Sequence, residues 1–454
     1  MKNQIITFIF ISTCTMLFTS ANAQSEAKPI CPAPDRIMLT IPGDPATSRA
    51  VTWRTCPSAN KTIGQIAEAT ASPFFGDRLT AIEGTSTFWM KGDSSALGHK
   101  VIFDKLSPET MYTYRVGDGD NWSEWFQFTT SSDQNQHFNF LYLGDFQNDI
   151  KQHGSRAIRQ AYSHFPQADF MLFAGDLVSR SSEDYWSEFF YAGNWIFGTM
   201  PSVPTPGNHE YEKHGDGEPR TFSKHWNQIF TTPDNHPRNL KDRTYFMDYQ
   251  GVRFVSVDSP AMVNGEEDGK ATIEWLHNVL ANNPNQWTIL FTHYPVYSCS
   301  QGRDKEEYRN ALKPILEKYG VDLVLQGHDH TYCRGQNLEG VGEDCENPPM
   351  YMVSVSGPKM YGLSVNRWSN RSASETQLYQ NIEVTNNKIN VDVFTVTGEL
   401  YDSFCLIKNK KGVNKVIESE LVKNIQVNSA IPEAKKSKYS EEELKLYMER
   451  YRTK

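Results

Sequence analysis

The stretch Phe138-Asn139-Phe140-Leu141-Tyr142-Leu143-Gly144-Asp145 decides how most of the chain folds. Its first six residues are almost continuously apolar, which is typical of a strand that is buried on both faces of a sheet. The glycine after them permits a sharp turn, so the carboxylate of Asp145 would project past the end of the strand. Because α/β sheets place functional groups at that end of their strands, we expect Asp145 to belong to a site.

The same kind of apolar run recurs four times further along the chain, at 170–174, 254–257, 288–292 and 321–325. Helix-like stretches lie between several of these runs, at 154–164, 184–197, 272–281 and 305–319. Buried strands separated by helices predict an α/β layered domain. Two later runs, 350–356 and 380–397, suggest a closing antiparallel portion, with Asn386-Asn387 as a turn signal.

Polar clusters follow the ends of the strand-like runs. They are Gly144-Asp145-Phe146-Gln147, Gly175-Asp176, Gly207-Asn208-His209-Glu210, His293 and Gly327-His328-Asp329-His330. Carboxylates, amides and imidazoles ligate divalent metal ions, and one carboxylate can bridge two of them. The candidate ligands are Asp145, Gln147, Asp176, Asn208, His293, His328 and His330. Such a set can hold two metal ions, and it leaves His209 available for proton chemistry.

The region before the apolar stretch has short strand-like runs and no convincing helix. The runs are 50–55, 64–70, 86–90, 99–103, 111–116 and 125–129, a spacing that favours a β-sandwich. Residues 106–112 look like the fibronectin type III approach to a tyrosine corner, so Tyr112 should form a hydrogen bond with the preceding loop. We expect a packing or positioning module; a separate sugar- or partner-binding role is the alternative.

The first 23 residues predict a cleaved secretory signal, with Lys2, an apolar run over 5–18 and the exit site Ala21-Asn22-Ala23. The mature chain would begin near Gln24 and be periplasmic or secreted. An uncleaved membrane anchor is the alternative. It is disfavoured because about 18 apolar residues are needed to span a bilayer, and polar residues at 12–15 interrupt this shorter run. We therefore expect no stable membrane insertion.

Six cysteines remain after signal cleavage, an even number that favours disulfides in an exported protein. Many pairings are possible. We expect Cys31 to pair with Cys56, and Cys333 to pair with Cys345. Elimination then leaves Cys299 with Cys405.

The composition disfavours a nucleic-acid partner. The formal net charge is -9, and loss of Lys2 with the signal would take it to -10. Nucleic-acid affinity depends on neutralisation of phosphates by clustered Lys and Arg. A neutral or small anionic substrate, held by a local positive site, remains compatible with this charge.

The chain becomes rich in Lys and Glu after residue 408 and ends in a predicted helix over 440–450. The start of that helix, Ser440-Glu441-Glu442-Glu443, is similar to a capping box. We expect a solvated or loosely docked tail, and a partner-binding helix is the alternative.

The strand-end clusters and the segments around them resemble one enzyme family, the calcineurin-like metallophosphoesterases. Within it, the chain is similar to the purple acid phosphatases, which have an N-terminal fibronectin-like domain. The matching segments are 245–249, 254–258, Trp275-Leu276, 293–298 and 327–332. The resemblance implies a fibronectin type III-like domain at 31–130, a catalytic domain at 137–407 and a tail at 408–454. It also implies that the α/β domain is a layered β-sandwich flanked by helices.

The resemblance implies a role for each candidate ligand. One metal site would use Asp145, Asp176 and His330, and the other would use Asp176, Asn208, His293 and His328, so that Asp176 bridges two ions. The ions would be divalent or mixed-valence Fe, Mn, Zn or Mg. A hydroxide held by the ions would attack phosphorus, and His209 would protonate the leaving oxygen or bind the phosphoryl group.

Two positions depart from the family pattern. The purple enzymes carry Gly-Asp-x-x-Tyr, whose Tyr ligates ferric iron and gives the colour, whereas this chain has Gly175-Asp176-Leu177-Val178-Ser179. Many other metallophosphoesterases have a His two residues after the first Asp, where this chain has Gln147. Gln147 could ligate a metal ion as a neutral oxygen donor, or it could support a ligand by hydrogen bonding.

We therefore expect an exported phosphomonoesterase, similar to the acid phosphatases, that hydrolyses small phosphate esters. Tyr297, Arg334, Lys359 and Tyr361 lie next to the motifs and are candidates for binding the substrate. A phosphodiesterase or nucleotide hydrolase of the same superfamily is the first alternative. A binding protein with a vestigial metal site is the second, and the intact set of candidate ligands argues against it.

Overall fold

The computed structural model describes residues 33–90, 93–214, 218 and 220–451. The predicted signal and Cys31 therefore lie outside the described residues. No helix among the residues described combines the length and the apolar character needed to cross a bilayer.

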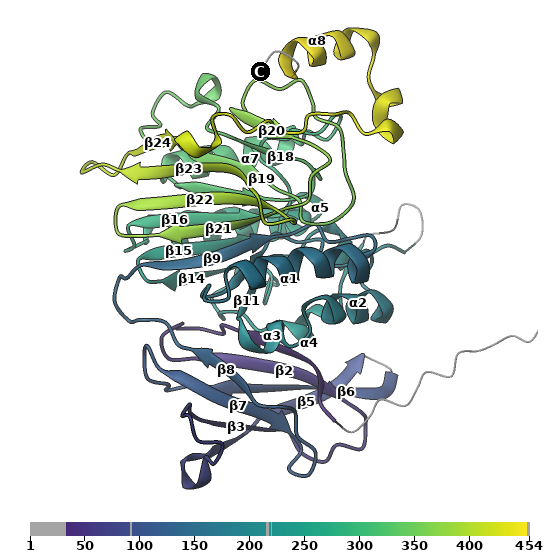
Figure 1. Cartoon of the computed structure of the whole chain (residues 1–454), viewed down its shortest axis with the longest axis vertical. Helices are drawn as coiled ribbons and strands as arrows, with labels where there is room; N and C mark the ends of the chain where they lie inside the picture. The colour runs from purple at the N-terminus through teal and green to yellow at the C-terminus, as the bar shows by residue number, and fades with distance from the viewer. Residues whose placement is uncertain (1–32, 91–92, 215–217, 219, 452–454) are drawn as a thin grey trace, which may run out of the picture.

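Two large sheets pack face to face and form the core of the α/β domain (Figure 1). The 11-stranded sheet contains, in spatial order, β24 (Asn414–Glu418), β23 (Leu400–Lys408), β22 (Lys388–Thr395), β21 (Leu378–Val384), β9 (Phe138–Leu143), β10 (Met171–Phe173), β11 (Ser202–Pro204), β1 (Asp35–Thr40), β2 (Arg49–Thr55), β6 (Asp93–Phe103) and β5 (Thr85–Met90). The seven-stranded sheet contains β14 (Tyr245–Tyr249), β15 (Val252–Val257), β16 (Trp287–Thr292), β17 (Leu323–Gln326), β19 (Met350–Val353), β18 (Tyr332–Gly335) and β20 (Arg371–Ala373).

Helices cover the outer face of each sheet, because side chains alternate between the two faces of every strand. In β9, Phe140 and Tyr142 point into the core between the sheets, whereas Leu141 and Leu143 pack against helices. The helices on this sheet are α1 (Ser155–His164), α2 (Glu183–Gly193), α3 (Ile196–Thr199) and α4 (Trp226–Ile229). Those on the seven-stranded sheet are α5 (Ser259–Asn264), α6 (Glu266–Ala281) and α7 (Glu306–Lys318).

The predicted layered α/β architecture is confirmed, since each of the five apolar runs forms a buried strand. Strands β9, β10 and β11 are parallel to one another, and so are β15, β16, β17 and β19. The expected helix over 184–197 is instead two helices. It breaks at Asn194, which has a φ of 46° that a helix cannot accommodate.

The N-terminal region is the predicted β-sandwich. Its second sheet contains β4 (Thr80–Glu83), β3 (Ile63–Glu68), β7 (Met111–Gly117) and β8 (Phe126–Thr129). The tyrosine corner is confirmed, because the Tyr112 hydroxyl accepts a hydrogen bond from the Ser107 N–H at 2.9 Å. The other sheet of this sandwich is continuous with the catalytic one, since β1 pairs in parallel with β11 at Thr40 and Ser202. The sandwich is thus fixed directly to the strand that precedes Asn208.

The C-terminal tail is docked more firmly than expected. It ends in helix α8 (Glu441–Tyr451), whose capping box forms as predicted between Ser440 and Glu443. Tyr439 and Tyr447 are buried against Leu363. The expectation of a solvated or loosely docked tail is therefore wrong, because these aromatic side chains bury apolar surface that a loose tail would leave in water.

The structure contains one disulfide among the described residues, between Cys299 and Cys333, with Cα atoms 6.5 Å apart. The pairings of Cys333 with Cys345 and of Cys299 with Cys405 are therefore wrong. The loop after β16 and the start of β18 are neighbours in space, which sequence separation does not reveal. The pairing of Cys31 with Cys56 stays a prediction.

Replacing both Cys299 and Cys333 by Ser should destabilise the protein. The disulfide joins residues 34 apart in the sequence, and closing a loop of that length is worth about 3–4 kcal/mol in the chain-entropy model. Urea unfolding of the double variant beside the unaltered protein measures the loss. Non-reducing peptide mapping provides the control, and a Cys333–Cys345 cross-linked peptide would contradict the assigned pairing.

Candidate metal centre

The predicted ligands converge because each follows the carboxyl end of a parallel strand, and these ends meet along one edge of the sandwich. Asp145, Asp176 and Asn208 follow β9, β10 and β11 of the 11-stranded sheet. The candidate histidines follow strands β16 and β17 of the facing sheet. The two sheets are joined there by the Asp145 carboxylate, which accepts a hydrogen bond from the backbone N–H of His328 at 2.8 Å.

Three of the predicted ligands form one tight group. His293 Nε2 lies 3.1 Å from Asp176 Oδ2 and 3.1 Å from His328 Nδ1. One ligand atom of each residue lies within 4.8 Å of the other two, and all three side chains are buried. A single cation could contact all three atoms.

A second group of predicted ligands lies beside Asp145. His330 Nε2 is 2.8 Å from the Gln147 amide nitrogen and 3.9 Å from Asp145 Oδ1. Rotating the Gln147 amide by half a turn would present its oxygen to the same space. The geometry therefore allows both roles that the sequence left open for Gln147.

Several buried polar atoms of this region have no hydrogen-bond partner among the described residues. Among them are Asn208 Oδ1, Gln147 Oε1 and His330 Nδ1. Buried polar atoms in folded proteins are nearly always satisfied. Cations would satisfy the two oxygens, so the residues present fit a metal centre.

The backbone of four predicted ligands is in the left-handed region. The φ angles are 54° for Asp145, 50° for Asp176, 73° for His328 and 50° for His330. Such conformations are uncommon for residues other than glycine and cluster at functional sites. At Gly175 only glycine fits, because a Cβ there would lie 2.6 Å from the backbone nitrogen of Gly207.

Hydrogen bonds fix which nitrogen of His293 and of His209 faces the site. His293 Nδ1 donates to the carbonyl oxygen of Ala174 at 2.9 Å, which leaves Nε2 directed at Asp176. His209 Nδ1 donates to the carbonyl oxygen of Ser179 at 2.6 Å. His209 Nε2 is then 3.9 Å from Asp176 Oδ2, further away than His293 Nε2.

The electrostatics suit cation binding. Burial lowers the pKa values of His328 and His330 well below the ordinary value, which keeps both imidazoles neutral, as ligation requires. Burial opposes ionisation of Asp176, but the interactions of the carboxyl with His293, His209 and His328 together outweigh burial and lower its pKa. Asp176 is thus a buried carboxylate that needs positive charge beside it.

Comparison with known proteins gives two family matches. Residues 34–130 match the purple acid phosphatase N-terminal domain, and residues 138–332 match the calcineurin-like phosphoesterases. The chain therefore contains a calcineurin-like phosphoesterase domain preceded by a purple acid phosphatase N-terminal domain. The catalytic match covers every predicted ligand, and the N-terminal match covers the sandwich.

Relatives of this phosphoesterase extend over most of the chain. It is 26% identical to acid phosphatase type 7 of Danio rerio over 440 residues, which cover 85% of this chain and 93% of that protein. It is 28% identical to purple acid phosphatase 21 of Arabidopsis thaliana over 298 residues, 64% of each chain. A solved structure of a purple acid phosphatase from yellow lupin seeds superposes with a TM-score of 0.68 at 17% identity, over 84% of this chain and 75% of that one. This last match shows a shared fold.

A cavity of about 320 Å³ opens over the candidate metal centre of the phosphoesterase. It is lined by Gln147, Asp176, Asn208, His209, Arg220, Tyr294, Arg303, Lys305, His328, His330, Lys359 and Tyr361. Lys359 and Tyr361 were expected there. Arg303 and Lys305 were not predicted to line it, because they lie in a loop that carries no motif. The cavity is thus rich in cations although the protein as a whole is acidic.

Tyr297 and Arg334, the other two candidates for substrate binding, lie elsewhere. Tyr297 packs against the rings of Tyr351 and Trp368 in the outer core. Arg334 is buried and pairs with Asp402 and Glu418. Proximity to a motif in sequence was misleading because neighbouring residues of an extended segment point in opposite directions.

Glu210 is a supporting residue to which the sequence analysis gave no role. Its buried carboxylate accepts hydrogen bonds from the backbone N–H groups of Gly207 at 2.7 Å, Asp176 at 2.9 Å and Leu177 at 2.8 Å. It therefore fixes the turn that carries Asp176 against the turn that carries Asn208. Its place in the Gly207-Asn208-His209-Glu210 cluster was the signal available in the sequence.

Glu210→Ala should destabilise the phosphoesterase and weaken metal binding, because it leaves buried N–H groups without acceptors. Each such group costs about 1–3 kcal/mol. Denaturant unfolding and elemental analysis measure the two effects. Glu212→Ala is the matched control, and equal behaviour of the two variants would contradict the role given to Glu210.

The metal-loaded protein should have no intense visible absorption band. The position of the family's ferric-ligand Tyr is occupied by Ser179, whose hydroxyl accepts a hydrogen bond from the Asn148 N–H at 2.7 Å. Its carbonyl oxygen holds His209. Absorption spectra of the iron-loaded protein test this expectation, and a purple colour that persists after free iron is removed would contradict it.

Proposed function

We propose that this phosphoesterase is an exported phosphomonoesterase, similar to the acid phosphatases, that acts on small phosphate esters. The observation that carries the proposal is the convergence of Asp176, His293 and His328 at the base of a cation-lined cavity. His209 lies in the same cavity. A set of metal ligands alone would be compatible with many functions. A set of metal ligands beneath a cavity lined by cations is suited to binding a phosphoryl group.

The metal ligands would divide into two sets that share Asp176. Asp145, Asp176 and His330, with Gln147 beside them, would hold one ion. The other ion would be held by Asp176 and the set Asn208, His293 and His328. Two ions bound there would supply positive charge to the phosphoryl group and to the attacking and leaving oxygens.

His209 would donate a proton to the leaving oxygen. The carbonyl oxygen of Ser179 fixes the proton on Nδ1, so Nε2 is the nitrogen that can exchange a proton in the cavity. An imidazole in this position can protonate a departing alkoxide as a general acid. Its greater distance from Asp176, compared with His293, supports a role other than ligation.

The cations of the cavity would bind and orient the phosphoryl oxygens. Arg220, Lys305 and Lys359 have no ion-pair partner within the described part of the chain, although Lys305 lies over the ring of Tyr294 at 4.3 Å. A phosphate ester would neutralise them. Held in this way, the ester would face the metal ligands with its leaving oxygen on the side of His209.

Export is part of the same proposal. The signal-like first 23 residues predict it, and the Cys299–Cys333 disulfide supports it, because such bonds persist in oxidising compartments. The disulfide lies next to the segments that carry His293 and His330.

The proposed function predicts turnover of p-nitrophenyl phosphate by the metal-loaded protein. Bis(p-nitrophenyl) phosphate should be hydrolysed much more slowly, since a monoester presents more anionic oxygens to the cavity cations. Parallel steady-state assays measure both rates. A preference for the diester would contradict the monoesterase proposal, and turnover of neither ester would contradict phosphoester hydrolysis.

Two substitutions separate ligation from proton transfer. Asp176→Asn should lose both metal ions and nearly all turnover, because the shared ligand loses its charge. His209→Ala should keep its metal content and lose turnover by about 10²–10⁴-fold, the usual contribution of a general acid. Elemental analysis and activity are measured on both, with His137→Ala as the control. A metal-depleted His209→Ala protein would contradict the assignment.

A further inference from the structure

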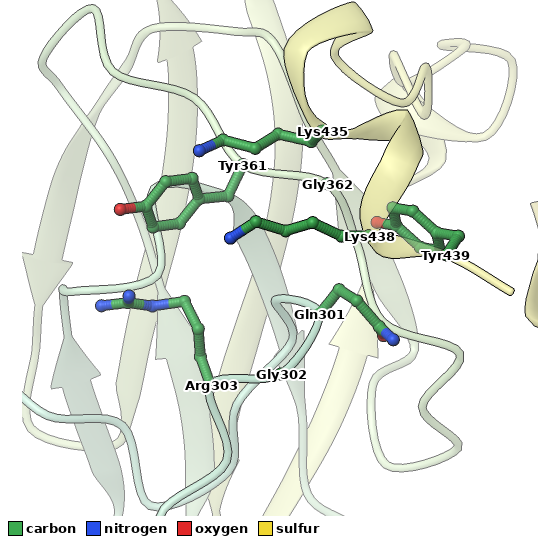
Figure 2. Close-up of a pocket in the computed structure, with 8 residues that line it drawn as sticks. All are labelled: Gln301, Gly302, Arg303, Tyr361, Gly362, Lys435, Lys438 and Tyr439. Atoms are coloured by element: carbon green, nitrogen blue, oxygen red, sulfur yellow. The ribbon is translucent and has the colours of Figure 1, made fainter.

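A second, smaller pocket adjoins the cavity over the metal ligands. It has a volume of about 110 Å³ and shares Arg303 and Tyr361 with that cavity. Its other wall comes from the C-terminal tail, where the 3-10 helix η6 (Glu433–Lys438) contributes Lys435 and Lys438 (Figure 2). A segment far from the catalytic motifs in sequence thus reaches the edge of the active site.

Tyr361 forms the wall between the two spaces. The Tyr361 ring contacts the ring of the candidate ligand His330, with the two centroids 4.8 Å apart. The Lys435 Nζ lies 4.6 Å from the centroid of the Tyr361 ring, and the Arg303 Cζ lies 4.8 Å from it. Figure 2 shows the charged ends of Lys435, Lys438 and Arg303 pointing to the same side of the pocket, around Tyr361.

Two of the three lysines of η6 lack an ion-pair partner among the described residues. Across the described residues, neither Lys435 nor Lys438 forms an ion pair, whereas Lys436 between them pairs with Glu433. Cations held near one another repel, and an anion bound between them relieves that repulsion. The pocket therefore has the charge and the small size that suit one phosphate group.

The tail holds these lysines in place. The Tyr439 hydroxyl, directly after η6, donates a hydrogen bond to the carbonyl oxygen of Leu363 at 2.6 Å. A Cβ at Gly362 would lie 2.1 Å from that hydroxyl, so the close contact requires glycine. The lysines are thus presented from a packed segment and not from a free end.

We propose that η6 completes a second phosphate subsite, so that the preferred substrate carries two phosphate groups. One phosphate would lie over the metal ligands while the other lies between Lys435 and Lys438, beside Arg303, which pairs with Asp329 at 3.4 Å and donates to the carbonyl oxygen of His328 at 3.1 Å. This inference rests on the proposed phosphatase function and narrows its substrate to small bisphosphorylated molecules.

The test compares monophosphates of alkane-α,ω-diols with the corresponding bisphosphates, using chains of three, four and six carbons. For at least one chain length, kcat/KM for the bisphosphate should exceed that for the monophosphate by about tenfold, which corresponds to about 1.4 kcal/mol. This ratio should fall to near one in the Lys435→Gln/Lys438→Gln double variant. It should persist in Lys436→Gln, which alters a lysine of the same turn outside the pocket.

The inference is overturned if no bisphosphate is preferred at any chain length, or if the preference survives in the double variant. A double variant that hydrolyses both kinds of ester faster would also overturn it, by showing that the tail obstructs the cavity. If p-nitrophenyl phosphate is still turned over in any of these cases, only the subsite fails and the proposed phosphatase function stands.

Binding provides a readout that does not depend on turnover. On the His209→Ala background, calorimetry with the best bisphosphate should show affinity about tenfold weaker when Lys435 and Lys438 are also replaced. Titration of inorganic phosphate into the same proteins shows whether the pocket binds a free anion or only the second phosphate of a substrate. Equal affinities for the bisphosphate with and without the two lysines would overturn the subsite.

Discussion

The carboxylate of Asp176 joins the parts of the candidate site. It lies just past β10, in a left-handed backbone conformation, beside a glycine that permits no side chain. Its Oδ1 accepts a hydrogen bond from the backbone N–H of His209 at 2.8 Å, while its Oδ2 faces His293, which follows a strand of the other sheet. A buried carboxylate in this position is costly unless positive charge accompanies it. The surrounding histidines and the cations of the cavity lie where they can supply that positive charge.

The arrangement depends on how the two sheets meet. Parallel strands bring their carboxyl ends to one edge, and face-to-face packing sets the ends of β9, β10 and β11 against those of β16 and β17. Glu210 and the Cys299–Cys333 disulfide tie the turns of each sheet together at that edge. The N-terminal sandwich continues the sheet through β1 and supports β11 from outside.

The sequence predicted those features that a local pattern determines. A buried strand needs an apolar run, and Asp145 and Asp176 each closely follow such a run, whereas Asn208 was recognised from the Gly207-Asn208-His209-Glu210 cluster. Features that depend on distant segments were missed or misjudged. The partner of Cys299, the docking of the tail through Tyr439 and the lysines of η6 all depend on which surfaces meet after folding. The direction of a side chain could not be predicted from the sequence either. Arg334 was therefore assigned to the substrate pocket, although it pairs with Asp402.

The most direct test of the account is the position of metal ions in crystals of the metal-loaded protein, located by anomalous scattering. Two peaks about 3.5–4 Å apart are expected, with Asp176 between them and His209 in contact with neither. A single peak, two peaks that do not share Asp176, or ligation by His209 would contradict the account.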